Sequence, residues 1–236
     1  MDGLQPEQQL QKTASKEKVA LVIGAGDATG GEIAKRFARG GYIACMTRRN
    51  AEKLQPLIAE IEAEGGLAYG FASDARKEDQ VIALVEEIEA NIGEIDVLVF
   101  NIGANVPCSI LEETARKYFK IWEMACFGAF LTGREVAKRM VVREHGSIIF
   151  TGATAGIRGA ANFAAFAGAK HALRALAQSM ARELGPKNIH VAHVVVDGAI
   201  DTDFIKDTFP EMYARKEQDG ILNPVHIAEN YWHLSQ

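Results

Sequence analysis

Three glycines, Gly24, Gly26 and Gly30, stand close together near the start of the chain. They lie between a short apolar run, Val19 to Ile23, and a stretch of helical periodicity that begins near Thr29. Amide groups at a helix N-terminus bind pyrophosphate oxygens, and residues without side chains let the backbone come close to them. Thr29 stands where the strict G-x-G-x-x-G pattern has its third glycine, so a tight turn without a ligand is the alternative interpretation.

The same segment predicts where a helix starts. Thr29 and Glu32 have the spacing of a capping box, in which a hydroxyl and a carboxylate accept hydrogen bonds from the first amide groups of a helix. Apolar residues at helical spacing follow at Ile33 and Phe37. We therefore expect the first helix to begin at once after the first strand, with the glycines in the turn between them.

A lysine is the second candidate for chemistry. Lys170 lies in a long alanine-rich stretch, and its neighbours Ala169 and Ala172 are small and apolar. This setting favours a buried ammonium group over a lysine on a helix surface. His171 lies about 100° further round a helix, so we expect its ring to face elsewhere.

Predicted strands and predicted helices alternate along the chain. Short apolar, β-branched runs predict strands at 19–23, 42–46, 67–71, 97–100, 147–150 and 189–196. Stretches of helical periodicity lie between or after them, at 51–65, 77–92, 114–143, 160–184 and 225–234. The strands lack polar alternation, so both sheet faces must be covered. We predict an α/β fold with a single Rossmann-type, doubly wound parallel sheet and helices on both faces.

The chain divides into a leader and one domain. Residues 1–17 are polar, and we expect them to be disordered. Residues 18–236 form one predicted dinucleotide-binding domain. Within it, residues 201–222 have weak periodicity, mixed charge and two phenylalanines, Phe204 and Phe209. We interpret this segment as a lid over the substrate, with a plain surface excursion as the alternative.

Composition excludes several classes of function. The chain has 26 basic and 31 acidic residues, a formal net charge of −5, and so has no basic surplus for a nucleic acid partner. No apolar run approaches the roughly 20 residues that span a bilayer, so we expect a cytoplasmic protein without a membrane partner. Cys45, Cys108 and Cys126 form no disulfide or zinc motif. His190 and His193 should lie on opposite faces of a strand, so we expect no metal site.

The glycine turn resembles the phosphate loop of the short-chain dehydrogenase/reductase family, T-G-x-x-x-G-x-G. That pattern falls on residues 23–30. Ile23 replaces the threonine and Ala28 replaces the middle glycine, while the outer glycines are kept. A single loop with two departures is weak evidence, and later motifs strengthen it.

Those motifs follow in the family's order. Asp74 follows the third predicted strand, and Asn101 to Gly103 stands where the family has N-A-G. Asp197 to Thr202 resembles P-G-x-x-x-T, with Asp197 in place of proline. The resemblance covers about residues 18–234. It implies that the Asp74 carboxylate accepts from the adenine amino group; a cap for the helix beginning near Lys77 is the alternative.

The resemblance also implies a binding site for a nicotinamide dinucleotide. The residues carried over to that site are Gly24, Gly26, Asp27, Ala28, Thr29, Gly30, Thr47, Arg48, Arg49, Asp74, Ala75, Asn101, Gly103, Lys170, Asp197, Gly198, Ile200 and Thr202.

The residues at the end of the second predicted strand indicate which nicotinamide dinucleotide binds, NAD(H) or NADP(H). An acidic residue there bonds the ribose 2′-hydroxyl and repels a 2′-phosphate, but this chain has Arg48 and Arg49. A guanidinium can form two parallel, charge-assisted hydrogen bonds with a phosphate, which favours NADP(H). The Asp27 carboxylate is unfavourable near a phosphate unless one of the arginines neutralises its charge, so NAD(H) remains possible. The alternative is that both arginines pair with Glu52 or Asp74 on a solvated loop.

The family's catalytic tetrad is mostly missing. Lys170 matches the family's lysine, which places Phe166 at the position of the proton-donating tyrosine. The serine position falls on Ala153 and the asparagine position on Ala125. A second register used by divergent relatives places Phe163 at the tyrosine. Only the lysine of the four remains.

This loss leaves two interpretations of function. A positioned general acid contributes about 10²-fold to 10⁴-fold, whereas hydride transfer itself belongs to the cofactor. Hydride transfer to an unidentified small carbonyl, or from the corresponding alcohol, therefore remains possible if Lys170, the Thr154 hydroxyl or a water held by either supplies the proton. Thr151 is the other nearby hydroxyl. The alternative is a catalytically silent dinucleotide-binding sensor or supporting subunit.

The resemblance further implies a homodimer or homotetramer, with the helices from Ala160 and from Thr114 forming a shared face. Relatives usually add a seventh strand and a glycine-rich tail after this point, which this sequence does not show. We therefore expect either a shortened sequence or a substrate wall contributed from elsewhere.

Overall fold

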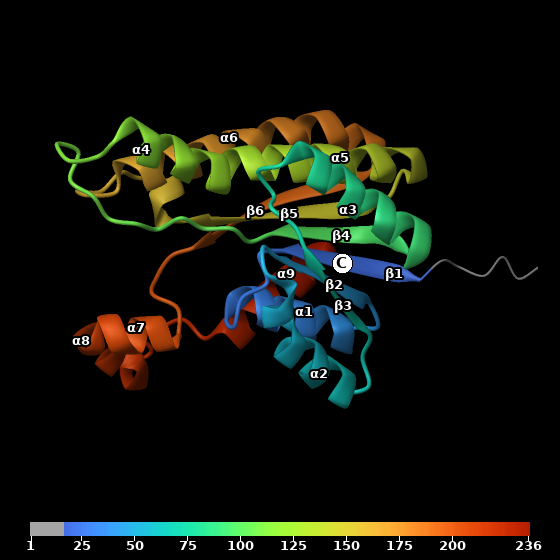
Figure 1. Cartoon of the computed structure of the whole chain (residues 1–236), viewed down its shortest axis with the longest axis horizontal. Helices are drawn as coiled ribbons and strands as arrows, with labels where there is room; N and C mark the ends of the chain where they lie inside the picture. The colour runs from blue at the N-terminus through green and yellow to red at the C-terminus, as the bar shows by residue number, and fades with distance from the viewer. Residues whose placement is uncertain (1–16) are drawn as a thin grey trace, which may run out of the picture.

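Six parallel strands form one sheet in the order β3-β2-β1-β4-β5-β6 (Figure 1). The computed structural model describes residues 17–236, so residues 1–16 of the expected leader lie outside the described part. The strands are β1 Lys18–Ile23, β2 Ile43–Arg48, β3 Ala68–Ala72, β4 Glu94–Phe100, β5 Gly146–Ala153 and β6 Ile189–Val196. Every neighbouring pair is parallel. The predicted doubly wound α/β fold is confirmed.

The described helices connect and cover these strands. They are α1 Thr29–Arg39, α2 Gln55–Ala63, α3 Glu78–Asn91, α4 Ala115–Trp122, α5 Gly128–Arg143, α6 Ala164–Leu184, α7 Asp203–Thr208, α8 Pro210–Tyr213 and α9 Pro224–Ser235. Helices α3, α5 and α6 lie on one face of the sheet, and α1, α2 and α9 lie on the other (Figure 1).

Strand β1 shows why both faces had to be apolar. Val19, Leu21 and Ile23 pack in a cluster with residues of α3, α5 and α6. Ala20 and Val22 pack in a second cluster with residues of α1, α2 and α9. Successive side chains of a strand point to opposite faces, so an uninterrupted apolar run is required where helices cover both.

The strand order reverses beside β1. The chain leaves β1 through α1 toward one face and leaves β4 toward the other face, so the two connections separate at the carboxyl ends of β1 and β4. A crevice at this switch point is where open α/β sheets bind ligands. The glycines that follow β1 and the asparagine that follows β4 are thereby brought together.

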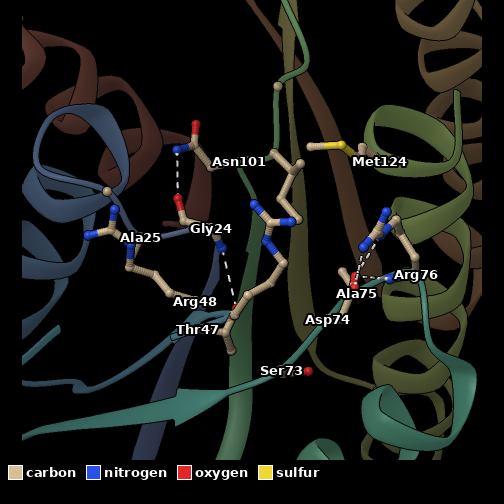
Figure 2. A pocket seen from close by; sticks show the side chains of 14 residues that line it. Gly24, Ala25, Thr47, Arg48, Ser73, Asp74, Ala75, Arg76, Asn101 and Met124 are labelled. Atoms are coloured by element: carbon tan, nitrogen blue, oxygen red, sulfur yellow. Dashed lines mark hydrogen bonds and ion pairs between the residues drawn. The ribbon is translucent and has the colours of Figure 1, made fainter. Parts of the chain in front are cut away.

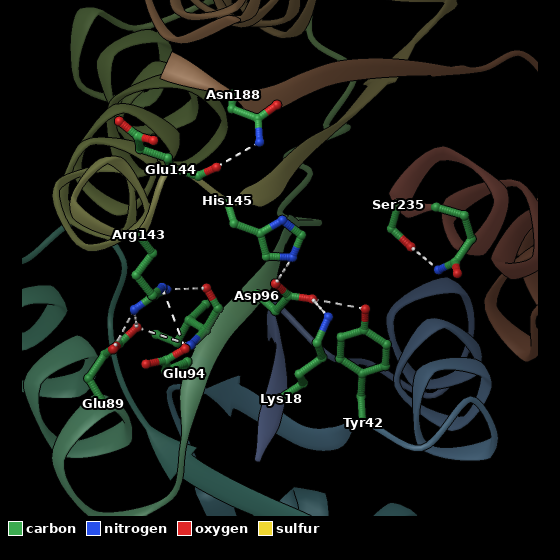
Figure 3. A network of polar contacts seen from close by, with 12 residues as sticks. Lys18, Tyr42, Glu89, Glu94, Asp96, Arg143, Glu144, His145, Asn188 and Ser235 are labelled. Carbon is green, nitrogen blue, oxygen red and sulfur yellow. Dashed lines mark hydrogen bonds and ion pairs between the residues drawn. The ribbon is translucent and has the colours of Figure 1, made fainter. Parts of the chain in front are cut away.

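At the amino ends of the strands, a polar network surrounds Asp96 (Figure 3). Its buried carboxylate accepts a hydrogen bond from the Tyr42 hydroxyl at 3.0 Å and from Lys18 Nζ at 3.2 Å, and it lies 2.6 Å from His145 Nε2. Burial and the Asp96 charge raise the pKa of Tyr42. These groups satisfy one another, far from the carboxyl ends of the strands.

Three details differ from the sequence predictions. The Thr29 capping box is wrong: α1 begins with Ala28 as its N-cap residue and has no side-chain cap, and Glu32 instead contacts Lys35 at 3.1 Å. Helix α6 begins at Ala164 rather than Ala160. A π-helical turn at 123–127 divides the expected helix 114–143 into α4 and α5.

The segment 201–222 folds as α7, α8 and a 3-10 turn at 214–218. The role of this segment as a lid over the substrate stays a prediction. Among the described helices, none has the length and apolar character needed to cross a bilayer.

Candidate active site

The turn from β1 to α1 is shaped by close backbone approaches. Gly24 has a φ of +84°, which L side chains rarely adopt. A Cβ on Gly30 would lie 2.6 Å from the Gly24 carbonyl oxygen and 2.9 Å from the Ala25 Cα, so only glycine fits there. A Cβ on Gly26 would meet nothing within 4 Å, because Gly26 borders open space. The turn therefore forms a cradle that a ligand can approach closely.

The start of α1 offers donors to that cradle. The helix begins at Thr29 without a side-chain cap, so its first amide groups keep the free-donor character of a helix N-terminus. The Thr29 hydroxyl is buried, and no hydrogen-bond partner for it lies among the described residues. A diphosphate at this turn fits the donors that the sequence arrangement predicts.

A cavity of about 350 Å³ lies along the carboxyl ends of β1 to β4. Its lining residues are Gly24, Ala25, Gly26, Thr47, Arg48, Arg49, Ser73, Asp74, Ala75, Arg76, Asn101, Ile102, Gly103 and Met124. Figure 2 shows Arg48 and Arg76 on opposite sides of it. The cavity thus brings together half of the predicted dinucleotide-binding residues, from four separate loops.

Thr47 and Asn101 hold the glycine turn in place. The Thr47 carbonyl accepts hydrogen bonds from the amides of Gly24 and Ala25, both at 3.2 Å. The Asn101 side-chain amide donates to the Gly24 carbonyl at 3.2 Å, and its backbone amide donates to the Ile23 carbonyl at 2.9 Å (Figure 2). These contacts tie the ends of β1, β2 and β4 together.

Arg48 pairs with the acidic residue of the glycine turn. Its Nη1 atom lies 3.2 Å from Asp27 Oδ1 and also donates to the Lys53 carbonyl at 3.4 Å. The Asp27 carboxylate therefore has a cationic partner. Asp27 is 92% exposed at its side chain, so this pair is open to solvent. Arg48 therefore pairs with Asp27 rather than with Glu52 or Asp74, whereas the charge of Arg49 acts on Asp74.

Asp74 is engaged by a residue that the sequence analysis missed. Arg76 Nε donates to Asp74 Oδ1 at 2.8 Å, and the Arg76 backbone amide donates to the same oxygen at 3.1 Å. These hydrogen bonds and the Arg76 charge keep the pKa of Asp74 below its usual range. The alternative role of Asp74 as a helix cap is wrong, because Lys77 is the N-cap residue of α3 and no side chain caps that helix.

Lys170 is buried at the end of the sheet. The residue is 2% exposed, so the alternative of a surface lysine is wrong. Its Nζ atom donates to the carbonyls of Thr151 at 2.7 Å and Ile102 at 3.2 Å. Loss of solvent around the ammonium lowers the pKa of Lys170 to about 8. The exposed His171 directs Nδ1 to the Ala167 carbonyl at 2.9 Å, away from this group as expected.

The tyrosine position is filled by a buried ring. Phe166 is 8% exposed and packs in an apolar cluster that includes Ala125, Ala165 and Ala169, with Ala153 against it. Its ring centre lies 5.8 Å from Lys170 Nζ. The positions that the family resemblance assigned to the tyrosine, serine and asparagine thus meet around Lys170 as apolar side chains.

Two threonines near these positions have different partners. The Thr151 hydroxyl lies 2.8 Å from the hydroxyl of Tyr231, a fully buried residue of α9 whose pKa burial raises. The Thr154 hydroxyl donates to the Asp197 carboxylate. Thr154 therefore does not have a free proton to offer while Asp197 is ionised.

Some residues assigned to the dinucleotide lie outside the lining of the cavity. They are Asp27, Ala28, Thr29, Gly30, Lys170, Asp197, Gly198, Ile200 and Thr202. Thr202 caps α7, where its hydroxyl accepts from the Ile205 amide at 3.2 Å. Ile200 forms a β-bridge with Leu222. The motif 197–202 thus shapes the base of the 201–222 segment, and its contact with a dinucleotide stays a prediction.

The π-helical turn at 123–127 is a further feature that periodicity did not reveal. It places Met124 in the cavity lining and Ala125 in the apolar cluster beside Lys170. Single π-turns within helices occur often at functional sites. Among the described residues, no group of histidine, cysteine and acidic side chains could hold a metal ion.

A family model described as short chain dehydrogenase matches residues 18–212. The chain belongs to this family. Short-chain dehydrogenases bind nicotinamide dinucleotides, and the fit of the glycine cradle and of the cavity agrees with that. The chain is therefore an oxidoreductase of the short-chain dehydrogenase type by family.

Individual relatives are dehydrogenases and reductases. The chain is 32% identical over 209 residues to 2-dehydro-3-deoxy-D-gluconate 5-dehydrogenase of Formosa agariphila, an alignment that covers 83% of this chain and 79% of that protein. It is 48% identical to a short-chain dehydrogenase structure from Rhodopseudomonas palustris, with a TM-score of 0.78 and coverage of 93% and 92%. A variant actinorhodin polyketide ketoreductase with NADPH is 26% identical, with a TM-score of 0.85 and coverage of 93% and 90%.

Proposed function

We propose that this short-chain dehydrogenase transfers a hydride between NADP(H) and a small carbonyl or alcohol, with the Lys170 ammonium as its proton donor. The observation that carries the proposal is the buried Lys170 amine, whose pKa is lowered to about 8 beside the position where the family has its tyrosine. When bound, the nicotinamide supplies or accepts the hydride.

Lys170 has the properties of a general acid at neutral pH. Two of its N–H groups are held by the carbonyls of Thr151 and Ile102, which leaves the third for a substrate oxygen. An acid whose pKa lies near the working pH transfers protons efficiently. The Thr154 hydroxyl is a poorer donor because it already donates to Asp197.

The preference for NADP(H) rests on the charges around the cavity. Arg48 and Arg49 line it at the end of β2, where a carboxylate would repel a 2′-phosphate. The Arg48 guanidinium lies beside Asp27, the acidic residue of the glycine turn that opposed this preference, and partly offsets its charge. A guanidinium can form two parallel hydrogen bonds with phosphate oxygens.

A catalytically silent dinucleotide-binding protein is the second candidate. The observation in its favour is the apolar cluster that Phe166, Ala153 and Ala125 share, since none of these side chains can donate a proton. In that case Lys170 would position the cofactor only.

The test combines binding with turnover. NADPH and NADH are titrated by fluorescence, and NADPH oxidation is then followed with a panel of aldehydes and ketones for wild type, Lys170→Ala and the exposed control Lys187→Ala. We expect turnover by wild type and by Lys187→Ala, and a loss of at least about 10²-fold in Lys170→Ala. An inert wild type that gains turnover from Phe166→Tyr with Ala153→Ser would favour the silent candidate.

A further inference from the structure

Strands β5 and β6 end side by side, and the first residue after each carries a polar side chain. The strands are paired up to Ala153 and Val196, so Thr154 and Asp197 follow at the same level of the sheet. Neighbouring strands lie about 4.8 Å apart, which lets short side chains at matching positions meet. The Thr154 hydroxyl donates a hydrogen bond to Asp197 Oδ1.

This pair lies outside the lining of the cavity, and Thr154 lies next to residues that pack on the apolar cluster around Phe166. Ala153 and Ala155, on either side of Thr154, pack against the apolar cluster that contains Phe166 and Ala169. The 3-10 turn at 154–156 packs on α6, and a Cβ on Gly156 would lie 3.1 Å from the Lys170 carbonyl oxygen. Asp197 is exposed, so a ligand can reach it from solvent.

The hydrogen bond fixes what the pair can recognise. An ionised carboxylate only accepts hydrogen bonds, so the single proton of the Thr154 hydroxyl is committed to Asp197. The lone pairs of Thr154 Oγ1 and the second carboxylate oxygen, Oδ2, then present acceptors only. A ligand group at this point must therefore donate, as a hydroxyl does and as a carbonyl or an ether oxygen does not.

We propose that Thr154 and Asp197 form a hydroxyl-binding subsite that selects substrates with a second hydroxyl group beside the reacting carbon. This inference rests on the proposed function for the meaning of the reacting carbon, which Lys170 serves. The substrate class is then a diol or hydroxy-carbonyl compound rather than a simple ketone. A diol can form a hydrogen bond with this pair that an analogue without the second hydroxyl cannot form.

A binding experiment tests the subsite without turnover. Protein saturated with NADPH, which cannot oxidise an alcohol, is titrated calorimetrically with 1,2-hexanediol and with 2-hexanol. We expect wild type to bind the diol at least about tenfold more tightly, since its second hydroxyl donates a hydrogen bond to a charged carboxylate. The variants Asp197→Asn and Thr154→Val should lose that preference, and Thr154→Ser should keep it.

The control is Asp207→Asn, the same change at an exposed residue of α7, which should leave the preference as in wild type. Equal affinity of wild type for both probes, no binding of either probe, or an unchanged preference in Asp197→Asn would overturn the subsite. Failure of the proposed function gives a different result: wild type binds the diol preferentially, but no diol or hydroxyketone is turned over with the matching cofactor.

Discussion

The Lys170 ammonium lies 5.8 Å from the centre of the Phe166 ring, four residues earlier on α6. A cation near an aromatic face is attracted by the ring quadrupole, which holds the ammonium in place without giving it a proton acceptor. The site therefore keeps the charge that a phenol would need but has no phenol. This relationship leaves Lys170 as the candidate proton donor.

Phe166→Tyr is expected to increase the rate of carbonyl reduction. A phenol at this position would lie beside the ammonium, which favours the phenolate and lowers the phenol pKa. We expect kcat to rise by about tenfold or more, at the low end of what a positioned general acid contributes. Steady-state kinetics with the best carbonyl of the panel measures it. Phe130→Tyr, at an exposed position of α5, is the control and should show no gain.

The buried amine should also make stability depend on pH. The pKa of Lys170 is lowered to about 8 in the folded protein, against about 10.4 for an ordinary lysine in the unfolded chain. Between these values the unfolded chain binds more protons, so the free energy of unfolding rises with pH, by about 3 kcal/mol in total at most. This contribution is lost as pH falls through about 8.

Urea denaturation of wild type and Lys170→Met across this pH range measures the effect. The methionine variant lacks the titrating group, so its stability relative to wild type should be greatest below the folded pKa and should decline as pH rises. Lys187→Met, at an exposed position, should follow the wild-type curve. Parallel curves for wild type and Lys170→Met would show that the amine is not desolvated.

Arg48→Asp should weaken NADPH far more than NADH. The change removes a donor to the 2′-phosphate and adds a carboxylate beside Asp27, whose charge Arg48 neutralises at 3.2 Å. We expect at least about a tenfold larger loss for NADPH, the size of one charge-assisted hydrogen bond. Fluorescence titration with both dinucleotides measures it, with Arg182→Asp on α6 as a remote control. Equal weakening of the two would refute the assignment.

Two glycine variants separate folding from binding at the β1 to α1 turn. Gly26→Ala adds a methyl group to open space, so the melting temperature should stay near wild type while dinucleotide affinity falls, because the methyl occupies the cradle. Gly30→Ala forces a contact of 2.6 Å with the Gly24 carbonyl and should lower both. Thermal melts of the free proteins and titrations with NADPH measure the pair. Unchanged affinity in Gly26→Ala would place the ligand elsewhere.

Patterns of local residues predicted the fold well. The apolar runs of β1 to β6 and the glycines after β1 are visible without tertiary information, because a strand covered on both faces needs an apolar side chain at each position. The sequence motifs also brought Gly24, Thr47, Asp74 and Asn101 to one cavity. Their shared place at the carboxyl ends of neighbouring strands makes this possible.

Features that depend on distant contacts were missed. The Thr154–Asp197 pair joins residues far apart in the chain and is set by the register of β5 on β6, which no motif encodes. The π-turn at 123–127 packs against α6 and is not visible in the helical periodicity of the segment. The Thr29 capping box failed because the tight approach of Gly30 to Gly24 places Thr29 inside the helix, with its hydroxyl buried.

We propose that the β1 to α1 turn and the arginines at the end of β2 bind a phosphorylated nicotinamide dinucleotide. Isothermal titration calorimetry of the purified protein with NADPH and with NADH tests this proposal. We expect saturable heat with both dinucleotides and a lower Kd for NADPH. The absence of heat with either dinucleotide would contradict it.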